Sequence, residues 1–365
     1  MNYKSMNNMK LFGKILCLTV LAMCLAACEK PEPDVTPVDS IPVNPTDSPH
    51  ALILNEGSWG GNNASISYLD LSAGTLENGW FSRINNRGLG DLAQDLVVYG
   101  AKAYVTVSES ESLEVIDTAT GVATRVDLGQ RYPRYIAAEG GKLYITCYKP
   151  HSVIRIDTAT LEVEATCTLG NFNPEGIAAV GGKLLVASSS ISDEQGNYSY
   201  DNMVYAIDIA SFSLIGTIPV GYNPQKILAL GNNTAVVNYI GDYASQPAGS
   251  AVIEASLAVT QLGQELTNMT VADGIIYGYY TAWAADYSSK TTNFVKIDAA
   301  RNITPILPGK DINAYAIGVH PVSGNLYIAD DGNYTSNGDL HCFSPDGTLR
   351  WKREVGMMPS KIVFL

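Results

Sequence analysis

The sequence predicts an all-β fold, a seven-bladed β-propeller, and three features of the chain support this prediction. Residues 133–170 contain short stretches of alternating apolar residues, which are separated by turns rich in Gly, Asp and Thr. Units of the same kind recur along the chain. The two ends of the chain each carry an incomplete part of one such unit, and together they complete it.

The recurring unit is recognised by an apolar residue in its first strand. Aligning "PRYIAA", "PEGIAA" and "PQKILA" with related stretches places this residue at Leu96, Ile136, Ile177, Ile227, Met269, Ile317 and Ile362. The gaps are 40, 41, 50, 42, 48 and 45 residues. A period of this length with four strands per unit is typical of propeller blades. The repeats show no 3.6-residue periodicity, which excludes helical repeats.

The chain ends decide the number of blades. The last six residues, "SKIVFL", resemble "QKILAL" of residues 225–230, so they form a first strand with no second strand after it. The stretch "ALILNEG" from Ala51 is a second strand that lacks a first. We therefore expect the C-terminal strand to pair with the N-terminal one and close a ring of seven blades without exposed sheet edges.

Residues 1–28 have the pattern of a secretory signal, with lysines followed by a short apolar run. The run ends in "LAAC", which resembles the lipobox of bacterial lipoproteins, and this resemblance implies lipidation of Cys28. Residues 29–50 contain six prolines and no apolar periodicity, which predicts an extended tether before a propeller of residues 51–365. The acidic residues after Cys28 loosely resemble export signals of Bacteroidota lipoproteins, so we expect an outer-membrane, lipid-anchored protein at the cell surface.

Charge and cysteine content limit the partners. The formal net charge is -13, and removal of the three signal-peptide lysines makes it -16. This sign disfavours nucleic acid and phospholipid headgroups as partners. Cys147, Cys167 and Cys342 lie at no metal-binding spacing, so we expect small buried apolar residues and no metal.

From residue 51 to residue 365 the blade motifs resemble the YncE-like seven-bladed propellers. More narrowly, the chain resembles the propeller lipoproteins of Bacteroidota that include corrinoid-capturing, BtuG-type proteins. This resemblance implies a corrinoid such as vitamin B12 as the ligand. It also implies an outer-membrane TonB-dependent transporter as the partner that receives it.

The connections between strands predict two different faces of the ring. Turns between strands one and two, and between three and four, are short, as in "EGGK" and "DTAT". Connections between strands two and three lie on the other face and are long and rich in Tyr, Trp, Asn and Gly, a composition suited to recognition. They comprise residues 56–63, 147–151, 188–202, 238–249, 279–291 and 330–338.

We expect a ligand on this second face, held by aromatic side chains. The candidate residues are Trp59, Tyr148, Tyr243, Tyr279, Trp283 and Tyr334 in the loops, with Tyr132, Phe172 and Tyr222 on the links between blades. Catalytic motifs are not found, the four histidines are scattered, and the acidic loops lack the spacing of a calcium loop. We therefore expect neither a catalytic function nor a cofactor.

The sequence predicts a surface lipoprotein that binds a small molecule and delivers it to a transporter. Aromatic platforms also stack on sugars, so glycan binding is an alternative. A protein-interaction scaffold is a second alternative, in which the loops dock a protein, and a hydrolase with unrecognised residues is a third. Binding measurements on the purified domain with cobalamin and with common glycans would distinguish these functions.

Overall fold

The computed structural model describes residues 48–193, 195–284 and 289–365, which all belong to one compact unit, Ser40–Leu365. The predicted signal peptide, Cys28 and nearly all of the predicted tether lie outside the described residues. None of the helices in the described ranges is long and apolar enough to span a membrane.

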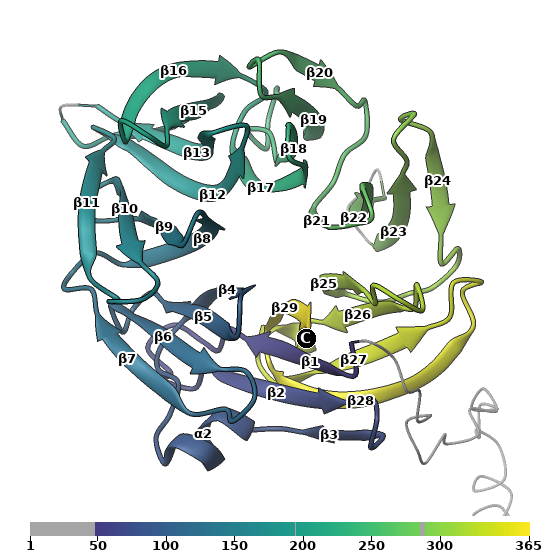
Figure 1. The fold of residues 1–365 in the computed structure, drawn as a ribbon. Helices are drawn as coiled ribbons and strands as arrows, with labels where there is room; N and C mark the ends of the chain where they lie inside the picture. Colours follow the sequence, from purple (N-terminus) through teal and green to yellow (C-terminus); the bar gives the residue numbers. More distant parts are fainter. Residues whose placement is uncertain (1–47, 194, 285–288) are drawn as a thin grey trace, which may run out of the picture. The chain divides into compact units, whose positions relative to one another are not determined.

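Seven antiparallel sheets are arranged around a central axis, as the sequence predicts (Figure 1). Each sheet has one strand next to the axis. These innermost strands are β29 (Pro359–Phe364), β4 (Ala93–Tyr99), β8 (Pro133–Glu139), β12 (Phe172–Val180), β17 (Pro224–Gly231), β21 (Asn268–Ala272) and β25 (Ala314–Val319).

Three further strands lie outward from each innermost strand. The second strands are β1 (His50–Asn55), β5 (Lys102–Val107), β9 (Lys142–Cys147), β13 (Lys183–Ser192), β18 (Thr234–Tyr239), β22 (Ile275–Trp283) and β26 (Leu326–Asp330). The third strands are β2 (Ser65–Asp70), β6 (Ser112–Asp117), β10 (Ser152–Asp157), β15 (Met203–Asp208), β19 (Gly249–Glu254), β23 (Lys290–Ile297) and β27 (Asn337–Phe343). The outermost strands are β3 (Thr75–Glu77), β7 (Ala123–Asp127), β11 (Val163–Thr168), β16 (Ser213–Pro219), β20 (Val259–Gln261), β24 (Ile303–Ile306) and β28 (Leu349–Met357).

The core is divided among the interfaces between neighbouring sheets. Successive side chains of a strand point to opposite faces of the sheet. The middle strands carry apolar residues at successive positions, so both faces of each blade are apolar and each face packs against a neighbouring blade. Seven hydrophobic clusters result, one for each pair of neighbouring sheets. The seven apolar residues that define the repeat are all buried in innermost strands, as predicted.

The ring is closed by pairing of the two chain ends, which confirms the prediction. β29 runs antiparallel to β1, with Ile362 opposite Ile53 and Phe364 opposite Ala51. This sheet therefore has the order β29-β1-β2-β3, in which a C-terminal strand completes an N-terminal blade. Closure removes the exposed edge that an open array would have.

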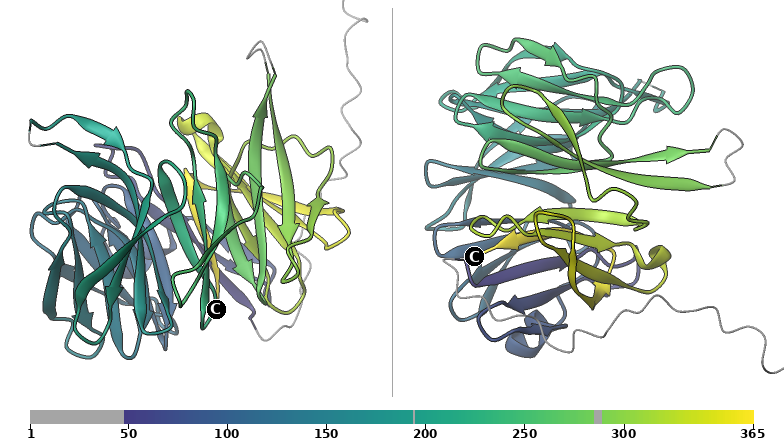
Figure 2. Two further views of the ribbon diagram at one scale, coloured as in Figure 1. Left: turned by 90° about the horizontal axis from the view of Figure 1, so that it is seen from above. Right: turned by 90° about the vertical axis from the view of Figure 1, so that its right-hand side faces the viewer.

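We call the end of the ring that carries the connections between second and third strands, and the links between blades, the loop face; the opposite end is the turn face. Two predicted loops are partly strands. β13 pairs with an added strand, β14 (Tyr198–Tyr200). β22 and β23 form a long hairpin, whose paired residues extend from Ile276 and Ile297 to Trp283 and Lys290. In the left view of Figure 2 both hairpins rise on one side, opposite the C-terminus. Polar residues, mainly Ser, Thr, Lys and Asn, predominate in the outer parts of these hairpins, so their sequences lack the apolar alternation that identifies a strand.

A short helix, α2 (Trp80–Asn85), was not predicted. Trp80 stacks on Tyr68 of β2 at a centroid distance of 5.1 Å, and both Trp80 and Phe81 are buried. Six residues are too few to show helical periodicity, so packing rather than local pattern holds this helix. The three cysteines of the propeller are buried and free, as expected.

Candidate functional site

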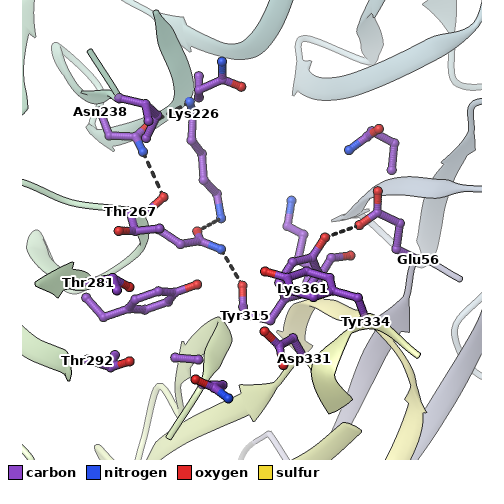
Figure 3. Close-up of a pocket in the computed structure, with 18 of the residues that line it drawn as sticks. Glu56, Lys226, Asn238, Thr267, Thr281, Thr292, Tyr315, Asp331, Tyr334 and Lys361 are labelled. Atoms are coloured by element: carbon purple, nitrogen blue, oxygen red, sulfur yellow. Dashed lines mark hydrogen bonds between the residues drawn. The ribbon is translucent and has the colours of Figure 1, made fainter. Parts of the chain in front are cut away.

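A cavity of about 470 Å³ lies at the loop-face end of the central channel (Figure 3). Six of the seven innermost strands contribute to its wall near their first residues, and loops of the same face complete it. Its polar and charged wall residues are Glu56, Gln94, Asp95, Tyr135, Gln225, Lys226, Asn238, Tyr243, Thr267, Asn268, Tyr279, Thr281, Lys290, Thr292, Asn313, Tyr315, Asp331, Tyr334, Ser360 and Lys361.

The polar lining arises from the first residues of the innermost strands. Asp95, Tyr135, Lys226, Asn268 and Lys361 each directly precede the apolar residue that defines the repeat. Six innermost strands have a register irregularity near this position, as between Pro224 and Ile227 of β17. A β-bulge re-aims side chains locally, so in the bulged strands the apolar residue packs between blades while its polar neighbour lines the channel. β21, which carries Asn268, keeps a regular register.

Hydrogen bonds between these polar residues connect neighbouring blades. The amide of Asn268 donates to the carbonyl oxygen of Tyr315 at 2.8 Å, and the Tyr315 hydroxyl donates to Glu56 at 2.6 Å (Figure 3). Lys361 forms an ion pair with Asp95, whose other oxygen accepts from the backbone N–H of Ile136 at 2.9 Å. The cavity wall is therefore also a polar belt that links blades around the channel.

Burial shifts the pKa values of two charged groups in opposite directions. Burial, together with the positive charge of Lys361, lowers the pKa of Lys226 to about 7, while Asp95 acts in the other direction. Burial raises the pKa of Glu56, partly offset by its hydrogen bond with Tyr315 and the charge of Arg134. The cavity thus contains a lysine that changes charge near neutral pH.

The loop face also carries exposed aromatic side chains, of which Tyr243 and Tyr334 line the cavity. Among the described residues, the large aromatic side chains that are mostly or substantially exposed are Trp59, Tyr198, Tyr200, Tyr243 and Tyr334. All five lie between the second and third strands of their sheets. The rings of Tyr200 and Tyr243 are 5.9 Å apart, so aromatic contact extends from one blade to the next. The turn face carries no such side chain in the part of the chain that is described.

The structure places the predicted ligand-binding residues in three different environments. Tyr243, Tyr279 and Tyr334 line the cavity, although Tyr279 is almost fully buried. Trp59 is exposed on the β1–β2 loop, away from the lining. Trp283 ends β22, but its side chain lies outside what the structure describes.

The remaining four predicted residues do not line the cavity. Phe172 is buried and stacks on Tyr205 at a centroid distance of 3.5 Å, so it belongs to the core between two blades. Tyr132, Tyr148 and Tyr222 are half-buried on loops and links of the loop face. The Nζ atom of Lys149 lies 5.3 Å from the ring centroid of Tyr132.

Sequence reasoning missed most of the polar wall, including Lys226, Lys361, Asp95, Asn268 and Glu56. The alignment of first strands contained the signal, because four of these five residues occupy one column, directly before the apolar residue. Glu56 gives no such signal, since it follows β1 in a loop.

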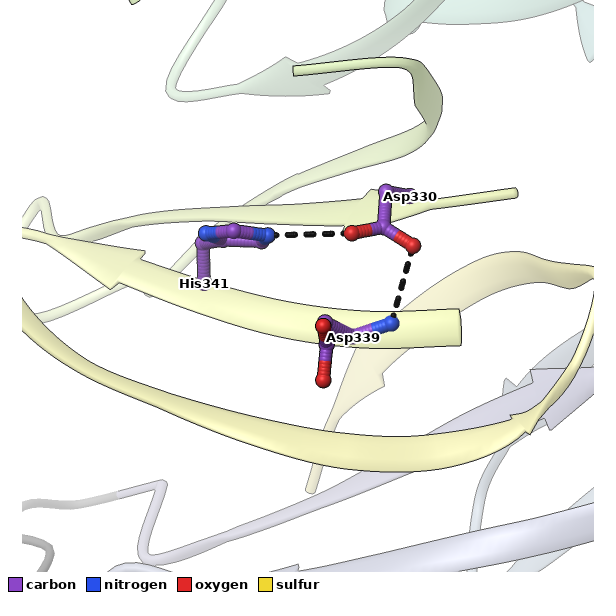
Figure 4. Close-up of side chains that lie close together, drawn as sticks. All are labelled: Asp330, Asp339 and His341. Atoms are coloured by element: carbon purple, nitrogen blue, oxygen red, sulfur yellow. Dashed lines mark hydrogen bonds and ion pairs between the residues drawn. The ribbon is translucent and has the colours of Figure 1, made fainter. Parts of the chain in front are cut away.

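A second polar cluster lies on the same face at the end of β26 and the start of β27 (Figure 4). Asp330, Asp339 and His341 offer ligand atoms within 4.8 Å of one another. Asp330 lies 3.2 Å from His341 and accepts from the backbone N–H of Asp339 at 3.0 Å, and Lys352 forms an ion pair with Asp339 at 2.5 Å. These internal partners are sufficient to explain the cluster as a structural element of the 330–338 loop.

The sequence profile of the DUF5074 family, a domain of unknown function, matches residues 50–339. The chain belongs to the DUF5074 family. The match covers the propeller from β1 to the first residues of β27 and leaves β28 and β29 beyond it. No protein of curated function matches the sequence.

Solved structures similar to this DUF5074 propeller share its fold at low identity. A quinoprotein alcohol dehydrogenase-like protein from Bacteroides thetaiotaomicron has a TM-score of 0.63 at 14% identity, covering 87% of this chain and 78% of that one. Hydrazine synthase from Kuenenia stuttgartiensis has a TM-score of 0.57 at 17% identity, covering 72% and 85%. Virginiamycin B lyase from Staphylococcus aureus has a TM-score of 0.53 at 14% identity, covering 80% and 91%. These similarities concern the fold alone.

Proposed function

We propose that this DUF5074 protein is a binding protein without catalytic activity, which takes a small molecule at the loop-face end of the channel. One observation carries the proposal: the cavity opens on the face where the described exposed aromatic side chains also lie. Its volume of about 470 Å³ falls within the range of about 300–1,000 Å³ that small-molecule sites occupy. A rigid ring with polar groups inside and aromatic groups at the rim is suited to capture.

A corrinoid is the ligand class that we propose. A corrinoid is a large ring with neutral amide side chains, so it needs hydrogen-bond donors, acceptors and flat apolar surfaces together. The cavity supplies donors such as Lys226 and acceptors such as Asn313 and Asp331, and Tyr243 and Tyr334 supply exposed rings. The cavity is smaller than a whole corrinoid, so part of the ligand would rest on the rim. The resemblance to BtuG-type lipoproteins supports this choice.

The test is calorimetric titration of cyanocobalamin into the purified propeller and two variants, Tyr243→Gly and Tyr334→Gly. Glycine is the appropriate replacement because the φ angles of these tyrosines are 60° and 61°, a region that glycine adopts freely. Each variant should keep its melting temperature and lose about 1–2 kcal/mol of binding free energy, roughly 5- to 30-fold in affinity. Val322→Ala, an exposed turn-face residue, is the control and should bind like wild type.

Two results would contradict the proposal in different ways. Wild-type affinity in both tyrosine variants would place the ligand elsewhere on the molecule. A wild-type protein that binds no corrinoid but binds an oligosaccharide would exchange the ligand class for a glycan. Binding of neither would favour a protein partner on the loop face.

We further propose that the protein is lipid-anchored through Cys28 at the outer membrane, on the cell surface, and passes its ligand to a TonB-dependent transporter. The "LAAC" sequence that ends at Cys28 supports the anchor. Cys28→Ala should release the protein from the membrane fraction or stop its maturation, because acyl chains provide the attachment. Cys24→Ala, in the same signal segment, should leave membrane attachment unchanged, and a soluble wild-type protein would overturn the proposal.

A further inference from the structure

Lys226 extends from β17 toward the middle of the cavity, where Lys361 extends from β29 (Figure 3). Its Nζ atom donates to the side-chain oxygen of Asn268 at 2.8 Å. Among the described residues, no carboxylate lies within ion-pair distance of Lys226, although the protein carries 36 acidic residues. A deeply placed ammonium group is usually paired, because desolvation without a counter-charge is costly.

The carboxylates of the cavity wall are already engaged by other groups. Asp95 is paired with Lys361, and Glu56 accepts from the hydroxyl of Tyr315 at 2.6 Å. Asp331 accepts from the backbone N–H of Asn333 at 2.8 Å. Among the described residues of the deep cavity wall, Lys361 therefore has a counter-charge, whereas the positive charge of Lys226 has none.

We propose that Lys226, next to Lys361, is the anchoring point for an anionic oxygen group of the ligand, either a carboxylate or a phosphate ester. This inference rests on the proposed small-molecule site and specifies the chemistry of its deep end. An anionic group bound there would accept from Lys226 and form a charge-assisted hydrogen bond, which is stronger than the present bond to a neutral amide. The amide of Asn268 keeps the lysine oriented when no ligand is bound.

The anchoring point also predicts how binding depends on pH. The groups that face Lys226 are Lys361 from β29, Asp95 from β4, Tyr135 from β8, Asn268 from β21 and Tyr315 from β25, with Glu56 from the β1–β2 loop. Burial and Lys361 lower the pKa of Lys226 to about 7, and only its protonated form attracts an anion. Anion affinity should therefore be highest below pH 7 and fall by up to about tenfold per pH unit above it.

The experiment uses sulfate, whose charge is constant over this pH range, titrated calorimetrically into the propeller at several pH values. Wild type should bind sulfate with proton uptake near neutral pH, and Lys226→Met should lose this binding. Asn268→Asp places a carboxylate 2.8 Å from Nζ and should also abolish it while the lysine remains. Lys183→Met, at the turn-face end of β13, is the matched control and should bind sulfate like wild type.

Melting temperatures separate loss of binding from loss of folding, and the Asp variant gives a second, independent route if the Met variant unfolds. Sulfate binding that persists in folded Lys226→Met, or that does not weaken above pH 7, would overturn the inference. Absence of sulfate binding to wild type would overturn it as well.

A pair of corrinoids connects this inference to the proposed function. Cyanocobalamin carries a phosphodiester, whereas cobinamide lacks it. Wild type should prefer cyanocobalamin, and Lys226→Met should reduce that preference by about tenfold or more. Sulfate binding without corrinoid binding would keep the anionic anchor and overturn the corrinoid proposal. Corrinoid binding that Lys226→Met does not change would keep the corrinoid proposal and overturn the anionic anchor.

Discussion

Lys226 combines a deep position, a lysine neighbour and a neutral hydrogen-bond partner, and this combination has a consequence for stability. Its pKa in the folded protein is about 7, below the value of about 10.4 for a lysine in water. Between these two values the unfolded chain binds more protons than the folded chain. The contribution of Lys226 to the free energy of unfolding therefore rises with pH across this window, and its destabilising effect is complete below pH 7.

We therefore predict that Lys226→Met stabilises the protein at low pH. The gain should be about 1–3 kcal/mol at about pH 6, because an unpaired charge is replaced by an apolar side chain of similar length. It should become small near about pH 10, where the lysine is neutral in the folded state and largely neutral in the unfolded state. Urea unfolding at the two pH values, with Lys183→Met as control, measures the difference. Equal effects at both pH values would contradict the lowered pKa.

At the residue scale the sequence predicted apolar positions better than polar ones. Ile136, Ile227 and Ile362 were recognised because every blade needs an apolar residue at that position. The residues directly before them share one column of the repeat alignment but differ in chemistry, as in Tyr135, Lys226 and Lys361, so no common residue type marks that column as a site. The bulged strand geometry and ring closure bring their side chains to one wall of the channel.

At the scale of strands, the polar belt links elements that are distant in sequence. Asp95 of β4 pairs with Lys361 of β29 and accepts from the backbone N–H of Ile136 in β8. One side chain thus connects three blades at the channel. Its loss would leave a lysine without a counter-charge beside Lys226, and a buried N–H without an acceptor.

We predict that Asp95→Ala lowers the free energy of unfolding by about 2–4 kcal/mol, since it breaks a buried ion pair and a buried hydrogen bond. Chemical denaturation monitored by tryptophan fluorescence measures this change. Glu109 is an exposed acidic residue of the β5–β6 loop, and the control Glu109→Ala should change stability by less than about 0.5 kcal/mol. If Asp95→Ala lowered the free energy of unfolding as little as Glu109→Ala, the polar belt would not stabilise the contacts between blades.

The strands that were difficult to predict are those with few apolar residues. β14 and the outer parts of β22 and β23 carry many polar residues, and their pairing is set by continuation of an existing ladder rather than by burial. Strands of the blade interior were predictable because both of their faces are apolar. The aromatic composition of the long connections between second and third strands did predict where exposed aromatic side chains lie, including Tyr243 and Tyr334.

For the whole molecule, closure of the ring is the feature on which the site depends. β29 supplies Lys361 and Ser360 to the cavity wall and pairs with β1 over five residue positions. The C-terminal strand therefore completes both the last interface of the core and the channel. The sequence predicted this closure because the first and last segments are complementary halves of one repeat.

Deletion of residues 360–365 should abolish soluble expression or lower the melting temperature strongly. The deletion leaves the innermost position of one sheet empty and exposes the edge of β1. A chain of full length that carries a short Gly-Ser extension after Leu365 is the control and should melt like wild type. A truncated protein that melts like the full-length protein would show that β29 is not needed for closure.

The central claim is that the channel mouth on the loop face holds the ligand, and the position of a bound ligand tests it most directly. The measurement is a crystal structure of the propeller grown with cyanocobalamin. We predict ligand density over the cavity, in contact with Tyr243 and Tyr334, with its phosphodiester near Lys226. Density on the turn face or on the outer strands, or an empty cavity at saturating ligand, would contradict the account.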